Sequence, residues 1–223
     1  MSLINTTIGL IAPHYCVECG TSGTVLCKEC AFSTTQMPSI RSVCAKATKA
    51  YTPCAAHNRS RMPNHVFAAL SYDGVAKKLV HAYKFDCKRA AAKDIVFVMD
   101  LWLPYLEPDS IFTWVPTLPK HVRQRGFDHT KLLAKEFGNL RSLKASSVID
   151  RVGAASQVGA NKAQRKAQLK NAFAIKSKVN IKSKKIVLID DVVTTGATIE
   201  ACSKLLYAAG AASVSVVALA RTP

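Results

Sequence analysis

Two adjacent carboxylates, Asp190 and Asp191, stand between an apolar run and a loop of small hydroxyl-bearing residues. The apolar run has the length and composition of a buried strand, and residues 199–209 repeat apolar side chains at helical spacing. Carboxylates at a strand end can accept hydrogen bonds from vicinal ribose hydroxyls, directly or through a divalent cation. The loop precedes a helix, whose N-terminal N–H groups and dipole favour a phosphate. The pattern predicts a ribose 5-phosphate site, with the phosphate held by Thr194, Thr195, Gly196, Ala197 and Thr198.

A polar turn that only caps a helix would also contain these residue types. The order of strand, acid pair, glycine and helix favours the phosphate site. Residues 187–199 resemble the signature with which type I phosphoribosyltransferases bind 5-phosphoribosyl 1-pyrophosphate (PRPP). The resemblance implies that Asp190 and Asp191 bind the ribose, that residues 194–198 bind the 5-phosphate, and that Mg²⁺ accompanies PRPP.

A second candidate segment follows the predicted strand at 111–115, because open α/β sheets bind ligands at the carboxyl ends of their strands. Its backbone amides and basic side chains could neutralise the pyrophosphate that leaves PRPP. The alternative is a solvated basic loop, in which we expect His121 and His129 to be exposed. The candidate pyrophosphate-binding residues are Thr117, Leu118, Lys120, Arg123 and Arg125.

Residues 151–173 are rich in Ala, Gln, Lys and Arg, and this composition is typical of a mobile basic flap. A flap that closes over a diphosphate would exclude water and bring Lys162, Arg165 or Lys166 onto the leaving group. A disordered linker and a nucleic-acid-binding helix are equally compatible with the sequence.

Six of the eight cysteines lie before residue 65, in a segment with too little apolar periodicity to build a core of its own. Two Cys-x2-Cys pairs stand seven residues apart and offer the four soft ligands that tetrahedral zinc prefers. The spacing predicts a structural zinc ribbon held by Cys16, Cys19, Cys27 and Cys30.

A second cluster of Cys44, Cys54 and His57 has only three ligands, because Ala47 stands where the fourth is expected. Structural zinc sites nearly always have four protein ligands, so we favour a degenerate second ribbon over a working site. Cys202 lies on the apolar side of the last helix and is expected to be a packing residue.

The apolar patterns of the remaining chain alternate between strand and helix. This alternation predicts an α/β fold with a mostly parallel sheet and helices on both faces. Together with the cysteine pattern, it divides the chain into a zinc-ribbon module, residues 13–65, and a phosphoribosyltransferase-like domain, residues 66–223. The expected strands lie at 66–72, 111–115, near 148, at 186–189 and at 213–219, and the expected helices at 75–83, 90–103, 132–137 and 199–209.

The chain has 31 basic and 14 acidic residues and a formal net charge of +17, which favours polyanionic partners such as nucleic acids or phosphorylated metabolites. Residues 1–12 lack a basic start followed by a long apolar core, and no segment reaches the length of a membrane span. We expect a cytoplasmic protein.

Taken together, the motifs resemble the ComF family, competence-associated proteins with a zinc ribbon and a phosphoribosyltransferase domain. Beyond the cysteine pairs and residues 187–199, the matching segments are residues 72–74 with Leu79, 84–85, 115–116, 123–127, Gln157 with Arg165, and 172–173. The chain departs from the family pattern at Asp128-His129, where Asn-Gln is usual, and at Gln168 and Asn171.

The resemblance implies PRPP binding in a setting of natural competence and DNA uptake, with other competence proteins as candidate partners. As an enzyme, the protein would transfer the phosphoribosyl group to an unknown acceptor; Thr194 stands where purine-salvage enzymes often have an acid, which disfavours a purine. The alternative is a non-catalytic protein that binds single-stranded DNA or a nucleotide.

Overall fold

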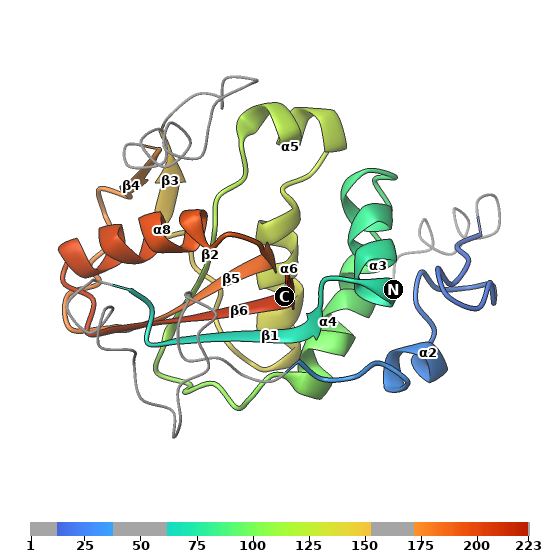
Figure 1. Ribbon diagram of the computed structural model, residues 1–223. Helices are drawn as coiled ribbons and strands as arrows, with labels where there is room; N and C mark the ends of the chain where they lie inside the picture. The colour runs from blue at the N-terminus through green and yellow to red at the C-terminus, as the bar shows by residue number, and fades with distance from the viewer. Residues whose placement is uncertain (1–12, 38–61, 153–171, 223) are drawn as a thin grey trace.

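The computed structural model contains a four-stranded, fully parallel sheet at the centre of the chain (Figure 1). The structure describes residues 13–37, 62–152 and 172–222. In spatial order the strands are β1 (His65–Ser71), β6 (Ser213–Arg221), β5 (Lys185–Val193) and β2 (Ile111–Trp114). The two central strands, β6 and β5, are rich in Val, Ile, Leu and Ala because both of their faces are buried.

Helices cover both faces of the sheet, so the predicted fold class is confirmed (Figure 1). Three helices pack on one face, α3 (Gly74–Lys84), α4 (Ala91–Trp102) and α6 (His129–Leu140). The other face packs on α8 (Ala197–Ala208) and a small antiparallel sheet, β3 (Ile149–Arg151) with β4 (Phe173–Ile175).

Side chains of β5 alternate between these two faces, as the pleat of a strand requires. Ile186 and Leu188 belong to the core beneath α8, whereas Val187 and Ile189 belong to the core beneath α3, α4 and α6. Continuing this alternation directs Asp190 toward the α8 side and Asp191 toward the α3 and α6 side.

The structure differs from the sequence expectations at three places. Strand β5 does not end before the acid pair, because its pairing with β6 continues to Val193 and Arg221. A short helix, α5 (Pro119–Arg125), replaces the expected basic loop; Pro119 suits its first position, and Gly126 ends it at φ 77°. Strand β4 was not predicted, and it begins at Phe173, the last residue of the expected flap.

The four cysteines of the first two pairs come together beside α2 (Lys28–Phe32), with all sulfur atoms within 4.8 Å of one another. Cys16 and Cys27 are buried, and the N–H of Cys27 donates to the sulfur of Cys16 at 3.4 Å. This geometry confirms the predicted cluster and is compatible with structural zinc. Cys44, Cys54 and His57 lie outside the described residues.

The cysteine cluster is packed onto the main domain through α4. Asp94 of α4 accepts hydrogen bonds from the N–H groups of Val25 and Leu26 at 2.9 and 3.0 Å. Both residues are buried in the same core as α3 and α4. An exposed ion pair, Lys78 with Glu18 at 2.9 Å, adds little stability because solvent screens it.

In the described part of the chain, no helix combines the length and apolar character needed to cross a membrane.

If the cluster holds a structural zinc ion, removing the metal should destabilise the protein, since metal-binding energy is folding energy for such a cluster. We expect Cys16→Ser to reduce the zinc content by one ion per chain and to lower the thermal midpoint by about 5 °C or more. Elemental analysis and thermal denaturation would measure both effects.

Cys87→Ser is the matched control, because Cys87 is exposed and lies outside the cluster. It should leave the zinc content and the thermal midpoint unchanged. A Cys16→Ser protein with the parent's zinc content would contradict the assignment.

Candidate functional site

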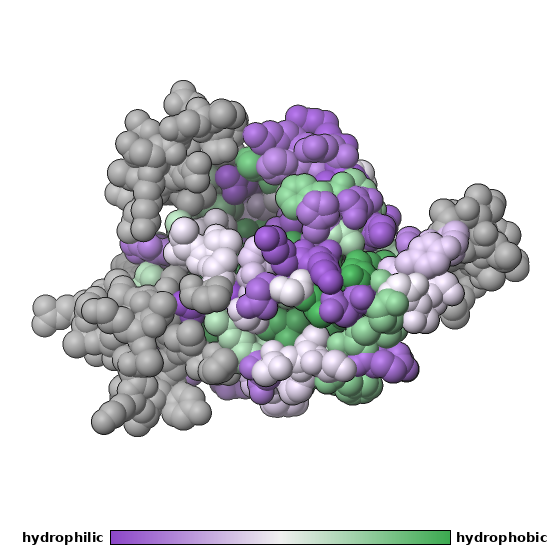
Figure 2. All heavy atoms as spheres, turned by 45° about the vertical axis from the view of Figure 1, so that its right-hand side comes forward, coloured by the Kyte–Doolittle hydropathy of each residue, from purple (hydrophilic) through white to green (hydrophobic). Residues whose placement is uncertain are grey.

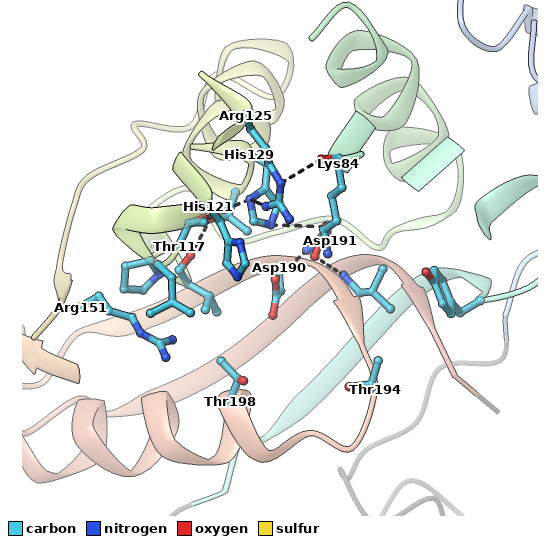
Figure 3. A pocket seen from close by; sticks show the side chains of 16 residues that line it. Lys84, Thr117, His121, Arg125, His129, Arg151, Asp190, Asp191, Thr194 and Thr198 are labelled. Atoms are coloured by element: carbon cyan, nitrogen blue, oxygen red, sulfur yellow. Dashed lines mark hydrogen bonds and ion pairs between the residues drawn. The ribbon is translucent and has the colours of Figure 1, made fainter. Parts of the chain in front are cut away.

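A cavity of about 360 Å³ lies at the carboxyl edge of the sheet, where β2 and β5 end (Figure 3). Its wall is built from the end of α3, the segment from β2 into α5, the start of α6, the end of β3 and the loop before α8. Both aspartates of the predicted ribose site line this cavity. A second, smaller cavity of about 40 Å³ adjoins it and is lined by Asp190 and residues 192–199.

Asp190 is half-buried and is the only acid that lines both cavities among the described residues. One of its carboxylate oxygens accepts the N–H of Asp191 at 2.9 Å. Burial, and then the charge of Asp191, raise the pKa of Asp190 well above its usual value. A cation or a hydroxyl donor in the cavity would therefore stabilise its ionised form.

Asp191 lies on the opposite side of β5 and is almost completely buried. Its Oδ2 is 2.5 Å from the ammonium of Lys84 and 3.5 Å from Nε2 of His129. Burial opposes ionisation, but Lys84 and His129 outweigh it, so the pKa of Asp191 is lowered. Asp191 is thus a buried carboxylate with its own internal cation.

The predicted phosphate loop forms the N-terminus of α8. Gly196 stands at the N-cap with φ 72°, a conformation that favours glycine. Thr194 and Thr198 line both cavities, and Thr195, Gly196 and Ala197 line the smaller one. The first N–H groups of a helix have no partner within the helix, so this wall can receive an anion.

The predicted pyrophosphate segment is only partly at the cavity. Thr117, Leu118 and Arg125 line it, whereas Lys120 and Arg123 do not. The hydroxyl of Thr117 donates to Asp128 at 2.7 Å, which fixes the start of α6 beside the cavity. The flap candidates Lys162, Arg165 and Lys166 lie outside the described residues.

The expectation that His121 and His129 are exposed loop residues is wrong. His121 is half-buried and lines the cavity, and His129 is only 7% exposed as the first residue of α6. Nη1 of Arg125 lies 3.0 Å from Nδ1 of His129. Because a guanidinium can only donate, Nδ1 must accept, and the proton of the neutral imidazole is on Nε2, facing Asp191.

The sequence did not indicate that two basic residues of the cavity, Lys84 and Arg151, are ligand-binding candidates. Lys84 is the last residue of α3 and entered the prediction only through the family match at residues 84–85, with no role assigned to it. Arg151, at the end of β3, lies over the ring of Phe173 at 4.7 Å and points toward the cavity (Figure 3). Its Nε is buried and has no hydrogen-bond partner within the part of the chain that the structure describes.

The cavity therefore combines hydroxyl-binding and anion-binding groups. Asp190 supplies an acceptor, the loop before α8 supplies N–H groups and hydroxyls, and Arg125 and Arg151 supply positive charge. This set suits a small ligand that carries both hydroxyls and anionic groups.

The buried His129 should make stability depend on pH. Burial, with help from Lys84 and Arg125, lowers its pKa from 6.5 to about 4, although the charge of Asp191 acts in the opposite direction. The unfolded chain therefore binds this proton at a higher pH than the folded chain does. Stability should fall as the pH falls through this interval.

We expect the parent to lose roughly 2 kcal/mol more than His129→Gln between pH 7 and pH 5, because glutamine does not titrate. Chemical denaturation at a series of pH values would measure this difference. Equal losses in the two proteins would contradict the buried, neutral state of His129.

Comparison with known proteins adds three findings. Residues 125–223 match the phosphoribosyl transferase domain family. The chain is 31% identical over 208 residues to the DNA utilization protein YhgH of Salmonella typhimurium. The aligned region covers 88% of this chain and 90% of that protein. The chain is also 32% identical over 155 residues to competence protein ComFC of Streptococcus pneumoniae. Here the aligned region covers 69% of this chain and 67% of that protein.

A solved structure described as the allosteric regulatory enzyme of purine biosynthesis matches 59% of this chain and 26% of that chain, with 16% identity and a TM-score of 0.42. The identity and coverage shared with the two relatives show that the chain belongs to the ComF family of proteins with a phosphoribosyl transferase domain.

Proposed function

We propose that the cavity at the carboxyl edge of the sheet binds PRPP together with Mg²⁺. One observation carries the proposal: the acid pair, the segment after β2 and two loop residues, Thr194 and Thr198, line one cavity. The rest of the phosphate loop lines the smaller cavity, which shares Asp190, Thr194 and Thr198 with the larger one. The phosphoribosyl transferase domain match covers the acid pair and the phosphate loop and supports the same ligand.

Each chemical group of PRPP can be assigned to a part of the cavity wall with suitable binding groups. The 5-phosphate fits the loop of residues 194–198, and the ribose hydroxyls fit the acid pair. The pyrophosphate fits the space beside Thr117, Leu118 and Arg125, where backbone amides and a guanidinium are available. Lys162, Arg165 and Lys166 remain candidates for covering the pyrophosphate.

The donor set also fits a hard divalent cation, which prefers oxygen ligands. Asp190 offers a carboxylate whose raised pKa, caused by burial and by Asp191, indicates that its negative charge lacks adequate compensation. Mg²⁺ bound by Asp190 and by PRPP oxygens would compensate this charge and that of the pyrophosphate.

If the protein turns PRPP over, the bond between the ribose C1 and the pyrophosphate oxygen breaks, and a new bond forms from C1 to the acceptor. The transition state for such pentosyl transfer resembles an oxocarbenium ion. The residues of the site would then hold the ribose in place and stabilise the charge on the departing pyrophosphate. The acceptor is the unassigned part of this reaction.

Calorimetric titration with PRPP and Mg²⁺ tests the proposal. The parent should bind, and the Asp190→Ala, Asp191→Ala double variant should lose at least tenfold in affinity, about 1.4 kcal/mol, because the acid pair would no longer receive the ribose. Asp109→Ala is the control, since this aspartate is exposed in the turn before β2. A parent that does not bind, or a double variant with parental affinity, would refute the proposal.

A second candidate function, binding of single-stranded DNA in DNA uptake, is favoured by the surface next to the cavity. Phe85 is 64% exposed, and the guanidinium of Arg125 lies 5.9 Å from the centre of its ring. The net charge of +17 provides a sequence-independent attraction for phosphates. Figure 2 shows hydrophilic side chains interspersed with apolar ones over the described part of the face that it draws.

An exposed aromatic ring beside a cation is a platform on which a base can stack. We expect Phe85→Ala to weaken binding of a short single-stranded oligonucleotide by about fivefold or more, measured by fluorescence anisotropy. Tyr105→Ala, a change at a ring that is 80% exposed, serves as the control. The same affinity in parent and Phe85→Ala, or binding that is insensitive to salt, would exclude this role.

A further inference from the structure

Lys84 and Asp191 form an ion pair inside the wall of the cavity. The ammonium and Oδ2 are 2.5 Å apart, and the two side chains are only 19% and 3% exposed. The other oxygen of Asp191 accepts the N–H of Val192 at 2.8 Å. Oδ2 accepts no hydrogen bond among the described residues, so the ammonium of Lys84 compensates its charge, whereas the other oxygen is occupied by Val192.

Asp190 is placed differently, because consecutive strand residues face opposite sides of the sheet. Its side chain points into the cavity on the side of Thr198 (Figure 3), and it lines the small cavity of the phosphate loop as well. Its only hydrogen bond among the described residues is the one from the N–H of Asp191. One carboxylate of the pair is thus available to a ligand, and the other is not.

A ring of contacts holds Lys84 in position. Nε of Arg125 donates to the carbonyl oxygen of Lys84 at 2.9 Å, and Nη1 of the same guanidinium donates to His129. His129 in turn faces Asp191. The ring joins the ends of α3 and α5, the start of α6 and the end of β5, so Lys84 is tied to each element that borders this side of the cavity.

We propose that Lys84 is a positioning residue of the ribose site: it keeps Asp191 as an internal counter-ion and leaves Asp190 as the carboxylate that receives the ribose hydroxyls. This inference rests on the proposed PRPP binding. It gives Asp190 and Asp191 different roles, whereas the sequence motif gives both aspartates the same role. Lys84 itself does not contact the ligand in this assignment.

Buried ion pairs behave asymmetrically on mutation, and this property makes the inference testable. Removing one partner leaves a buried charge without compensation, whereas removing both leaves none. In Lys84→Met, the unpaired carboxylate of Asp191 would add negative charge beside a ligand that is itself polyanionic. In Lys84→Met combined with Asp191→Asn, the wall is neutral and of nearly the same volume.

The experiment is a calorimetric titration of PRPP with Mg²⁺ into four proteins, with thermal midpoints recorded on the same samples. We expect Lys84→Met to lose at least tenfold in affinity and the Lys84→Met, Asp191→Asn variant to bind within about threefold of the parent. Asp190→Asn, with the Lys84 pair intact, should lose at least tenfold because it removes an acceptor for the ribose. The thermal midpoint should also recover in the double variant.

A double variant that binds as weakly as Lys84→Met, or more weakly, would overturn the inference, since Lys84 or Asp191 would then contact the ligand directly. Parental affinity in Lys84→Met would overturn it as well. If Lys84→Met does not fold, the contrast between the double variant and Asp190→Asn still decides the question. Absence of PRPP binding by the parent would refute the proposed function and the inference with it, whereas the other outcomes refute the inference alone.

Discussion

The burial of two consecutive carboxylates at the edge of the sheet is the constraint on which the site depends. Isolated buried charges are costly, and two adjacent ones repel each other as well. The fold meets this constraint by giving Asp191 a cation, Lys84, from a helix that packs on the same face of the sheet. No cation of the described residues lies within bonding distance of Asp190, and the rise in its pKa through burial and the charge of Asp191 reflects this difference. The cavity is consequently built around one free carboxylate.

The alternation of β5 explains why the two neighbours have different surroundings. The face that carries Asp191 packs on α3 and α6, which provide Lys84 and His129. The face that carries Asp190 packs on α8, which provides the phosphate loop. A single strand therefore connects the anion-binding wall to the internal ion pair, and the N-terminal cysteine cluster supports the same framework through Asp94 of α4.

Much of the fold could be predicted from sequence, because the apolar runs of β5 and β6 and the stripes of α3, α4 and α6 have clear periodicity. The cysteine cluster and the strand-loop-helix motif were predicted from local spacing alone. Lys84, Arg151 and the burial of His129 were not, because each depends on elements that are distant in the sequence and adjacent only in the fold. One signal was available: the period of two in β5 indicates that Asp190 and Asp191 face different sides.

The most direct test of this account is a crystal structure of the protein with PRPP and Mg²⁺. The account predicts that the ribose hydroxyls or the cation lie within bonding distance of Asp190, that the 5-phosphate contacts the first turn of α8, and that Lys84 still pairs with Asp191. A structure in which Lys84 has moved away and Asp191 has turned to the ribose would contradict it.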